Sequence, residues 1–515
     1  MNTSNSQEKR NLLFVWLTIG LLVLSISDLS ALNVEGNVSG EWTIENTPYV
    51  MIGSVFVPEG DTLIIHPGVV VIVLSHYTIE VSGLLIAEGI DDDRISMRGD
   101  NCTWGGLYFR RESDIMTRVI NCDIRDVWTG ISCDHNYMRI AGNQIEARNV
   151  AISCVGASPT IEDNRLIQVI ADNASLAIYA ISLRDGSHPY IINNEKIECR
   201  STAGGMAIGI LIRDHQSTPS IEGNWLEVSS QRGAAYGILT YRVNKLNINR
   251  NIIRVQSPTD MRGLWAISTT AANFFNNNVL LLGKSVEGVG IWLDVGSNFA
   301  IVNNIVIGNN NSIGIDSDSG HVDQQSGFNN FWQHAQNYQG FWEGFHDISA
   351  DPKFIRDDID PDFADYHLRW PNYPNIFDPE RSPCIDTGSP DFMNDPDNTT
   401  SDMGRHPYFE QVNEIHEIAS IAYQYQLSPP YPNPFNSTAN LKFTMDNPGY
   451  IKLSLYDQTG RLLDILDSGY RESGTHIVEW TACAGSSGRG YASGEYIIVL
   501  DAGGERHSRS VVLLK

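Results

Sequence analysis

The sequence predicts an all-β protein, in which a right-handed parallel β-helix solenoid is followed by a small C-terminal β-sandwich. The main observation is a pair of marks that repeat in step, 21 to 30 residues apart, between about residues 130 and 332. The first mark is a small residue followed by Ile, found at Gly130-Ile131, Ala151-Ile152, Ala180-Ile181, Gly209-Ile210, Gly237-Ile238, Ala266-Ile267, Gly290-Ile291 and Gly314-Ile315. The second mark is an Asn, found at Asn143, Asn164, Asn194, Asn224, Asn251, Asn278, Asn304 and Asn330.

Within each unit the apolar residues are spaced by two, which is the period of a strand and not of a helix. Helical repeats of this length would need longer amphipathic stripes, and the sequence has none. Short strands with Gly and Asn at the corners therefore predict coils that stack along one axis, about 4.8 Å apart. We interpret the Asn column as scaffold, because side-chain amides can bond to the coils above and below.

Alternation along the repeated strand separates core from surface. The Ile and the residue two positions later are expected to point inward, which places Cys133 and Cys154 in one core column. Stacked core thiols and a disulfide are both compatible with that spacing. The residue two before the Ile is also predicted to point inward, so Tyr236 and Trp265 are assigned to the core.

The composition limits the class of protein. A chain of 515 residues is too long for one compact core, so two or three units are expected. Charged residues make up 19% and hydrophobic residues 42%, which argues against a disordered chain. The formal net charge of −26 argues against nucleic-acid binding. It would also repel polyanionic substrates unless a divalent cation bridged them.

The beginning of the chain resembles an export signal. Lys9 and Arg10 precede an apolar run from Asn11 to Ser27, and small residues suited to signal peptidase follow. We predict a secretory signal peptide over residues 1–31, with an uncleaved membrane anchor as the alternative because the run is long. The protein is therefore expected to be secreted or held at the outer cell surface.

A resemblance to a known superfamily supports the fold. The segments Pro58-Glu59-Gly60, His66-Pro67-Gly68 and Trp104-Gly105-Gly106-Leu107 are similar to the opening coils of right-handed parallel β-helix proteins, the pectin-lyase-like and NosD-type repeat proteins. The resemblance spans about residues 38–407. It implies no single activity, because lyases, hydrolases, epimerases and adhesins share this fold. We assign the β-helix to residues 32–350 and a C-terminal cap segment to residues 351–410.

After a linker over residues 411–427, a new strand pattern occupies residues 428–515 and predicts a small β-sandwich. Its opening, an internal step and its tail resemble the C-terminal sorting domain of type IX (Por) secretion cargo, which has an FlgD-like immunoglobulin fold. The matching segments are Tyr431-Pro432-Asn433-Pro434-Phe435-Asn436, Ser493-Gly494-Glu495-Tyr496 and Val511-Val512-Leu513-Leu514-Lys515. This resemblance implies export by the type IX outer-membrane secretion machinery, and nothing about what the cargo does.

Function is predicted on the outward side of the repeated strands, one and three residues after each Ile. The substrate-binding candidates there are Arg184, Arg213, Tyr241 and Trp292. The catalytic candidates, on the C-terminal coils, are Asp294, Asp316 and Asp318. Carboxylates one coil apart fall in the roughly 5–9 Å range that glycosidases use, and an exposed indole can stack on a sugar ring. The alternative is that these are ordinary polar side chains on a solvent-facing strand.

A metal site is predicted at one loop. Asp395, Asp397 and Asp402 supply carboxylate oxygens at near-alternate spacing, which suits a structural Ca²⁺. Turn chemistry explains the same residues without a metal.

Together these observations predict a secreted, monomeric, cell-surface protein that binds extracellular polysaccharide along its lateral face. The alternative is a polysaccharide lyase or glycoside hydrolase that acts on extracellular glycan. The sequence lacks the paired-Asp and Gly-His-Gly motifs of polygalacturonase-like hydrolases and the usual calcium and arginine motifs of pectate lyases. That lack favours binding over catalysis.

Overall fold

The computed structural model describes residues 31–514, except 174–175, 284–286, 318–320, 323–325, 341–342, 359, 361, 393, 396–398, 409–424, 429, 446–448, 457–461, 472–473, 482–490 and 503–504. The predicted signal peptide, most of the predicted linker, Asp318 and Asp397 lie outside the described residues. The chain divides into two units, Met1–Glu410 and Gln411–Lys515, and each is described by itself.

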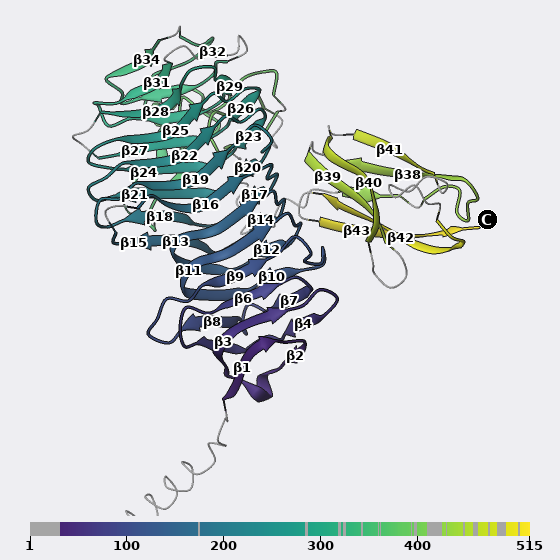
Figure 1. The fold of residues 1–515 in the computed structure, drawn as a ribbon. Helices are drawn as coiled ribbons and strands as arrows, with labels where there is room; N and C mark the ends of the chain where they lie inside the picture. Colours follow the sequence, from purple (N-terminus) through teal and green to yellow (C-terminus); the bar gives the residue numbers. More distant parts are fainter. Residues whose placement is uncertain are drawn as a thin grey trace, which may run out of the picture. The chain divides into compact units, whose positions relative to one another are not determined.

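The first unit is a solenoid whose coils each add short strands to three lateral faces, with parallel pairing between neighbouring coils (Figure 1). Four strands bend from the first face into the second: β1 (Leu32–Asn37), β3 (Tyr49–Val57), β11 (Cys122–Asp134) and β13 (Gln144–Val155). This architecture confirms the predicted parallel β-helix.

The first face continues through β5 (Val70–Val73), β8 (Ile95–Gly99), β15 (Leu166–Ala171), β18 (Ile197–Ser201), β21 (Trp225–Ser230), β24 (Ile252–Gln256), β27 (Asn278–Leu282), β30 (Ile305–Ile307) and β33 (Asn330–Trp332). The second face contains β6 (Thr78–Val81), β9 (Gly106–Phe109), β16 (Ile178–Arg184), β19 (Ala207–Arg213), β22 (Ala235–Tyr241), β25 (Met261–Ile267), β28 (Gly288–Leu293), β31 (Ile313–Ser317) and β34 (Gln336–Gln339).

The third face is a 12-stranded sheet. It contains β2 (Gly40–Trp42), β4 (Thr62–Ile65), β7 (Leu84–Glu88), β10 (Arg118–Ile120), β12 (Arg139–Ala141), β14 (Thr160–Glu162), β17 (Tyr190–Ile192), β20 (Ser220–Glu222), β23 (Leu246–Asn249), β26 (Ala272–Phe275), β29 (Asn298–Val302) and β32 (His321–Val322). One short 3-10 helix, η1 (Ile44–Asn46), lies between β2 and β3.

The repeated small residue marks a local irregularity in the second-face strands. Ala180 and Ile181 are both fully buried in the core, although they are neighbours along one strand. At the equivalent position in the next coil, a Cβ on Gly209 would lie 2.6 Å from the backbone oxygen of Gly237, which leaves little room for a side chain. Because two consecutive residues face inward, the residue before them faces outward.

Because of this irregularity, the prediction that the residue two positions before the Ile points into the core is wrong. Tyr236, two residues before Ile238, is buried, but it packs in an outer cluster separate from the solenoid core. Trp265 belongs to the same outer cluster, because its strand pairs in a different register from the predicted one. Leu264 pairs with Ile238, so Gly263-Leu264 is the repeated step and Ala266-Ile267 is not.

The asparagine column forms a continuous hydrogen-bonded ladder inside the solenoid, as the scaffold interpretation predicts. The Nδ2 of Asn224 donates to Oδ1 of Asn251 at 2.9 Å, and the Nδ2 of Asn251 donates to Oδ1 of Asn277 at 3.0 Å. The ladder contains Asn277 and Asn329 in place of the predicted Asn278 and Asn330. It ends at Asp347, whose Oδ1 accepts a hydrogen bond from Asn329.

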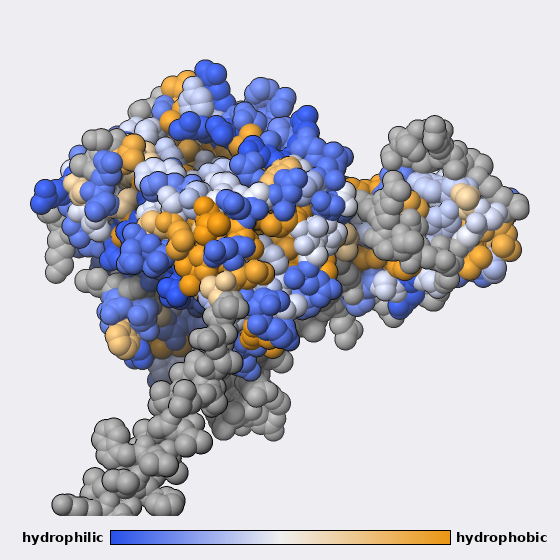
Figure 2. Space-filling model, turned by 60° about the horizontal axis from the view of Figure 1, so that its bottom comes forward, coloured by the Kyte–Doolittle hydropathy of each residue, from blue (hydrophilic) through white to orange (hydrophobic). Residues whose placement is uncertain are grey.

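The two core cysteines occupy the predicted column. Cys133 and Cys154 are register partners on β11 and β13, and both are buried free thiols. The disulfide alternative is therefore not formed. The start of the solenoid is less well covered, since Leu32 and Ile44 are exposed. Figure 2 shows apolar side chains gathered near the beginning of the first coil, with hydrophilic side chains around them.

The described residues between 351 and 408 leave the coils and pack against the outside of the first face. This strap contains a hairpin of β35 (Phe354–Arg356) and β36 (Asp365–Leu368). Tyr366 and Trp370 of the strap form an apolar cluster with outward residues of β24, β27 and β30, such as Leu280. The Arg405 guanidinium donates to the backbone oxygens of Gly223 and Asn224.

The second unit contains two antiparallel sheets that share one apolar core. The three-stranded sheet has β37 (Tyr425–Leu427), β38 (Thr438–Met445) and β41 (Gly474–Thr481). The four-stranded sheet has β39 (Gly449–Tyr456), β40 (Leu462–Arg471), β42 (Gly494–Ala502) and β43 (Glu505–Leu513). The predicted small β-sandwich is confirmed.

Candidate functional site

An aromatic strip lies on the outward side of the second face. Leu239, Trp265 and Trp292 are register partners on β22, β25 and β28, so their side chains follow one another along the solenoid axis. The two indole rings stack with centroids 5.8 Å apart and an interplanar angle of 24°. Tyr236 meets Trp265 edge to face at 5.1 Å. We call these four side chains, together with Arg262, the aromatic strip.

Arg262 lies against both indoles. The Cζ of its guanidinium is 3.7 Å from the ring centroid of Trp265 and 3.5 Å from that of Trp292. Asp260 holds this arrangement, because it pairs with Arg262 at 3.0 Å and accepts the Tyr236 hydroxyl at 2.7 Å. Burial lowers the pKa of Arg262, while the Asp260 carboxylate opposes that shift.

Three buried donors of the strip have no hydrogen-bond partner among the described residues. They are the Nη1 of Arg262 and the indole Nε1 atoms of Trp265 and Trp292. Unsatisfied buried donors are costly in a folded protein. These three atoms have almost no exposed surface, so they define no ligand contact by themselves.

The predicted binding residues occupy two neighbouring columns of the second face. Trp292 is in the strip, whereas Arg184, Arg213 and Tyr241 follow one another in the next outward column. All three are exposed, and the Arg242 guanidinium lies 5.0 Å from the Tyr241 ring centroid. The structure therefore places every predicted binding residue on one lateral face.

The predicted catalytic residues Asp294 and Asp316 differ in their burial and in their hydrogen-bond partners. Asp316 is buried directly beside Trp292 in register, and Gln339 donates to its Oδ2 at 3.3 Å. Asp294 accepts the backbone N–H of Val295 at 2.7 Å, which is a turn interaction. Asp318 lies outside the described residues.

The predicted calcium loop is built around a buried carboxylate. Asp402 accepts the backbone N–H of Asp386 and of Tyr408, while its own N–H donates to Asp395. Burial raises the pKa of Asp402 to about 8, and the Asp395 and Asp386 carboxylates add to that shift. In the part of the chain that the structure describes, no three acidic, His or Cys side chains gather as a metal site, and the Ca²⁺ assignment stays a prediction.

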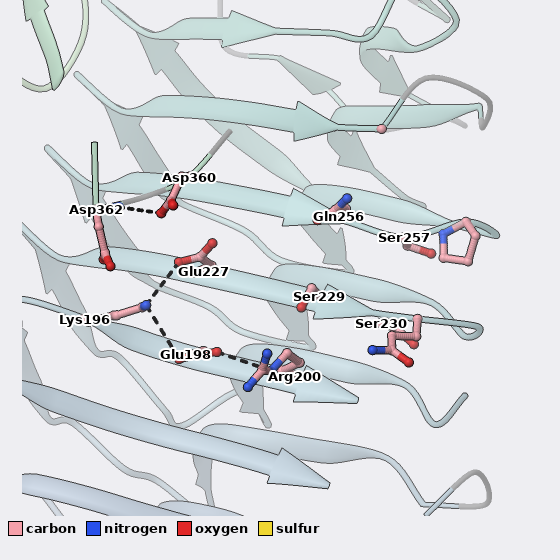
Figure 3. A pocket seen from close by; sticks show the side chains of 13 residues that line it. Lys196, Glu198, Arg200, Glu227, Ser229, Ser230, Gln256, Ser257, Asp360 and Asp362 are labelled. Carbon is pink, nitrogen blue, oxygen red and sulfur yellow. Dashed lines mark hydrogen bonds and ion pairs between the residues drawn. The ribbon is translucent and has the colours of Figure 1, made fainter. Parts of the chain in front are cut away.

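A concave region lies on the first face, where the strap passes over β18, β21 and β24. This groove has a volume of about 650 Å³ (Figure 3). Its floor carries Glu198 and Glu227, which are register partners on neighbouring strands, and its wall carries Asp360 and Asp362 of the strap. Its other lining residues are Lys196, Arg200, Ser229, Ser230, Gln231, Gln256, Ser257, Pro258 and Gly283.

Sequence reasoning missed Arg262, Trp265 and the groove. The Gly263-Leu264 step could have identified Arg262 and Trp265 as outward residues. Gly263 falls 26 residues after Gly237, within the repeat spacing. The groove had no local signal, since the residues of its wall lie more than a hundred positions from those of its floor.

The comparisons with known proteins bear on the fold. Residues 105–280 match the family model described as a right-handed β-helix region. No curated protein matches the chain. Among solved structures, a tailspike protein double mutant of E. coli bacteriophage HK620 in complex with pentasaccharide is 9% identical, with 89% of this chain and 86% of that chain covered and a TM-score of 0.16. A likeness that weak supports no conclusion about this chain.

No helix in the described part of the chain is both long and apolar enough to span a membrane. The matched residues 105–280 lie entirely within the parallel coils described above. The chain thus contains a right-handed parallel β-helix region.

Proposed function

We propose that this is a secreted, cell-surface β-helix protein that binds extracellular polysaccharide along its second face. The observation that carries the proposal is the stacked Trp265–Trp292 pair with Arg262 against both rings. Indole faces pack against the C–H surface of sugar rings, and flanking polar groups hydrogen-bond to ring hydroxyls. Arg262, Asp260 and Asp316 are the polar groups beside the rings.

The shape of the site favours a polymer over a small ligand. The strip follows the solenoid axis across neighbouring coils, and Arg184, Arg213 and Tyr241 extend the polar surface toward the N-terminal coils. Repeating units of a glycan chain could contact repeating coils. In this proposal the second unit directs export through the type IX machinery, which rests on the sequence resemblance described above.

The test is a glycan array probed with the wild-type protein, followed by Kd measurements on the glycans that bind. Trp292→Ala and Trp265→Ala should each weaken binding at least about tenfold, roughly 1.4 kcal/mol. Trp128→Ala is the matched control, because Trp128 is an exposed indole on β11, outside the strip. Equal affinities for all three variants, or no glycan bound on a broad array, would contradict the proposal.

Glycan cleavage is the second candidate function, and the buried Asp316 beside Trp292 is the observation in its favour. A carboxyl group in such a place can act as a proton donor or base. The glycans that bind should be assayed for new reducing ends and unsaturated products. If activity appears, Asp316→Asn should abolish it, and Asp294→Asn should not, because Asp294 bonds to its own turn.

A further inference from the structure

The solenoid begins with two strands that each have one free edge among the described residues. β1 and β2 belong to the first coil, at one end of the solenoid (Figure 1). β1 pairs with β3 and β2 pairs with β4, and no other described strand pairs with either of them. We call the first coil, residues 32–46, the open end. Free strand edges carry unpaired N–H and C=O groups and are sites where a further strand can pair.

The open end also exposes the end of the solenoid core. Leu32 and Val34 of β1 are register partners of Tyr49 and Met51, which are both buried in that core. Val34 is only partly buried, and Leu32 is 45% exposed. Figure 2 shows apolar side chains gathered near the beginning of this coil. A partner that covers the open end would therefore remove apolar surface from water.

Alternation along β1 identifies the backbone groups that point to its free edge. The N–H of Leu32 donates to the backbone oxygen of Pro48 at 3.1 Å, so Leu32 bonds to the side of β3. Alternate residues of a strand in a parallel pair bond to the same neighbour. The N–H and C=O groups of Asn33 and Glu35 therefore point away from β3, to the free edge.

A second copy of β1 matches this edge in an antiparallel register with a two-fold axis at Val34. In that register Asn33 of each copy lies opposite Glu35 of the other, and each such pair exchanges both backbone hydrogen bonds. The Asn33 amide can also donate to the Glu35 carboxylate, which forms no ion pair within the described ranges. An axis at Glu35 would instead place two carboxylates opposite each other, which is destabilising.

The inward side chains fit the same register. The two copies of Val34 face each other at the axis as a non-hydrogen-bonded pair, the kind whose side chains lie closer together. Leu32 lies opposite Gly36 of the second copy. A Cβ built on Gly36 has no atom within 4 Å, so the space beside this glycine is open to the leucine side chain. The apolar core of one solenoid would thus continue into the core of the other.

We propose that the open end is a homodimer interface, in which the β1 strands of two copies pair antiparallel about a two-fold axis at Val34. This assembly differs from the monomer that the sequence predicts. It uses the end of the solenoid and not its lateral faces, so it is independent of the proposed glycan site. The dimer would carry two aromatic strips, and one glycan chain that reached both would bind more tightly than to a single strip.

The first test is sedimentation velocity of the purified protein over a series of concentrations. About 0.15 M salt screens the repulsion between two chains of formal net charge −26. The wild type should show a monomer–dimer equilibrium. Glu35→Pro should weaken dimerisation at least about tenfold, because proline removes an N–H from the free edge and leaves the bonds between β1 and β3.

Charge at the same pair of residues gives a second, fold-preserving test. Asn33→Glu sets two carboxylates opposite each other across the interface and should weaken dimerisation, whereas Asn33→Lys sets an ammonium group opposite Glu35 and should strengthen it. Both changes are made at one exposed position, so thermal unfolding of the two variants should match that of the wild type.

A cysteine at the axis tests the register. The two thiols of a Val34→Cys dimer would face each other within reach of a disulfide, so oxidation with diamide should give a covalent dimer that dithiothreitol reverses. Asn37→Cys is the matched control, because its two copies would lie six residues of strand apart, roughly 20 Å. The wild-type chain reports any cross-linking through the native thiols, such as the partly buried Cys102.

The proposal is overturned if the wild type stays monomeric at every concentration, or if Glu35→Pro dimerises as tightly as the wild type. It is also overturned if Val34→Cys cross-links no faster than Asn37→Cys, or if the two Asn33 variants dimerise equally. Dimers that form only when residues 1–30 are present would assign the contact to those residues and overturn the proposal as well.

Discussion

At the scale of single residues, the ladder of asparagines holds the coils in register. Each amide is buried and accepts hydrogen bonds from the preceding coil while it donates to the following one. Asn251 accepts from the backbone N–H and the Nδ2 of Asn224, and it donates to Asn277 and to the backbone oxygen of Ile221. Loss of one member therefore leaves several buried partners unsatisfied, which costs more than the loss of a surface hydrogen bond.

Asn251→Ala should lower the free energy of unfolding by at least about 2 kcal/mol, because buried donors and acceptors lose their partners. Denaturant titration of the full chain measures this change. Asn247→Ala is the control on the same coil, since Asn247 is half-buried and bonds only weakly to Ser220 at 3.4 Å. The scaffold role of the ladder would be contradicted if both variants had the same stability.

Single residues also show which positions in the structure the sequence could predict. The repeat predicted the ladder and the outward positions of Arg184, Arg213, Tyr241 and Trp292. It misassigned two ladder members, because the consecutive asparagines at positions 276–278 and 329–330 offer no local criterion for which one points inward. It misplaced Trp265 because Ala266-Ile267 imitates the true Gly263-Leu264 step. Only pairing with the neighbouring coil resolves that choice.

At the scale of elements, the strap is the feature that the repeat could not predict. It packs across β24, β27 and β30, and its contacts join residues such as Arg254 and Asp358 that are 104 positions apart. Its own irregular sequence has no periodicity from which a partner could be derived. The strap completes the groove of the first face, so the groove was equally beyond sequence reasoning.

The strap should loosen as pH rises toward 8. Burial raises the pKa of Asp402 to about 8 from an unfolded value of about 3.9, so the folded strap favours the protonated carboxyl. This contribution to stability is complete below about pH 4 and is lost as pH rises through about 8. Hydrogen exchange of residues 384–408, measured between pH 5 and 9 and corrected for intrinsic rates, should show falling protection.

Asp402→Asn should remove most of this pH dependence, because an amide does not ionise. Asp391→Asn is the matched variant, since Asp391 lies in the same segment with an exposed side chain, and it should behave as the wild type. Protection that rises with pH in the wild-type protein would contradict this account of Asp402.

At the scale of the whole molecule, the chain combines a repetitive scaffold with a separate sandwich. Stacking of coils explains how 515 residues fold without one large core, since each coil packs mainly on its neighbours. The solenoid was predictable because every coil must bury its inward apolar side chains and pair with the neighbouring coils. The role of the second unit cannot be derived from its packing, because a small β-sandwich serves many functions.

Export should depend on the second unit. Deletion of residues 428–515 should trap the protein in the periplasm, because the proposed sorting signal lies there. Cell fractionation and protease accessibility at the cell surface compare the truncated and full-length chains. Normal surface display of the truncated chain would contradict the proposed sorting role.

The central claim is that the second face is the glycan-binding surface, and hydroxyl-radical footprinting of the protein with a glycan selected on the array tests it most directly. Binding should protect Trp265, Trp292 and Tyr241 from oxidation, while Trp128 and the exposed Phe377 of the strap remain as reactive as in the free protein. Protection confined to the first or third face, with the indoles of the strip still fully reactive, would contradict the claim.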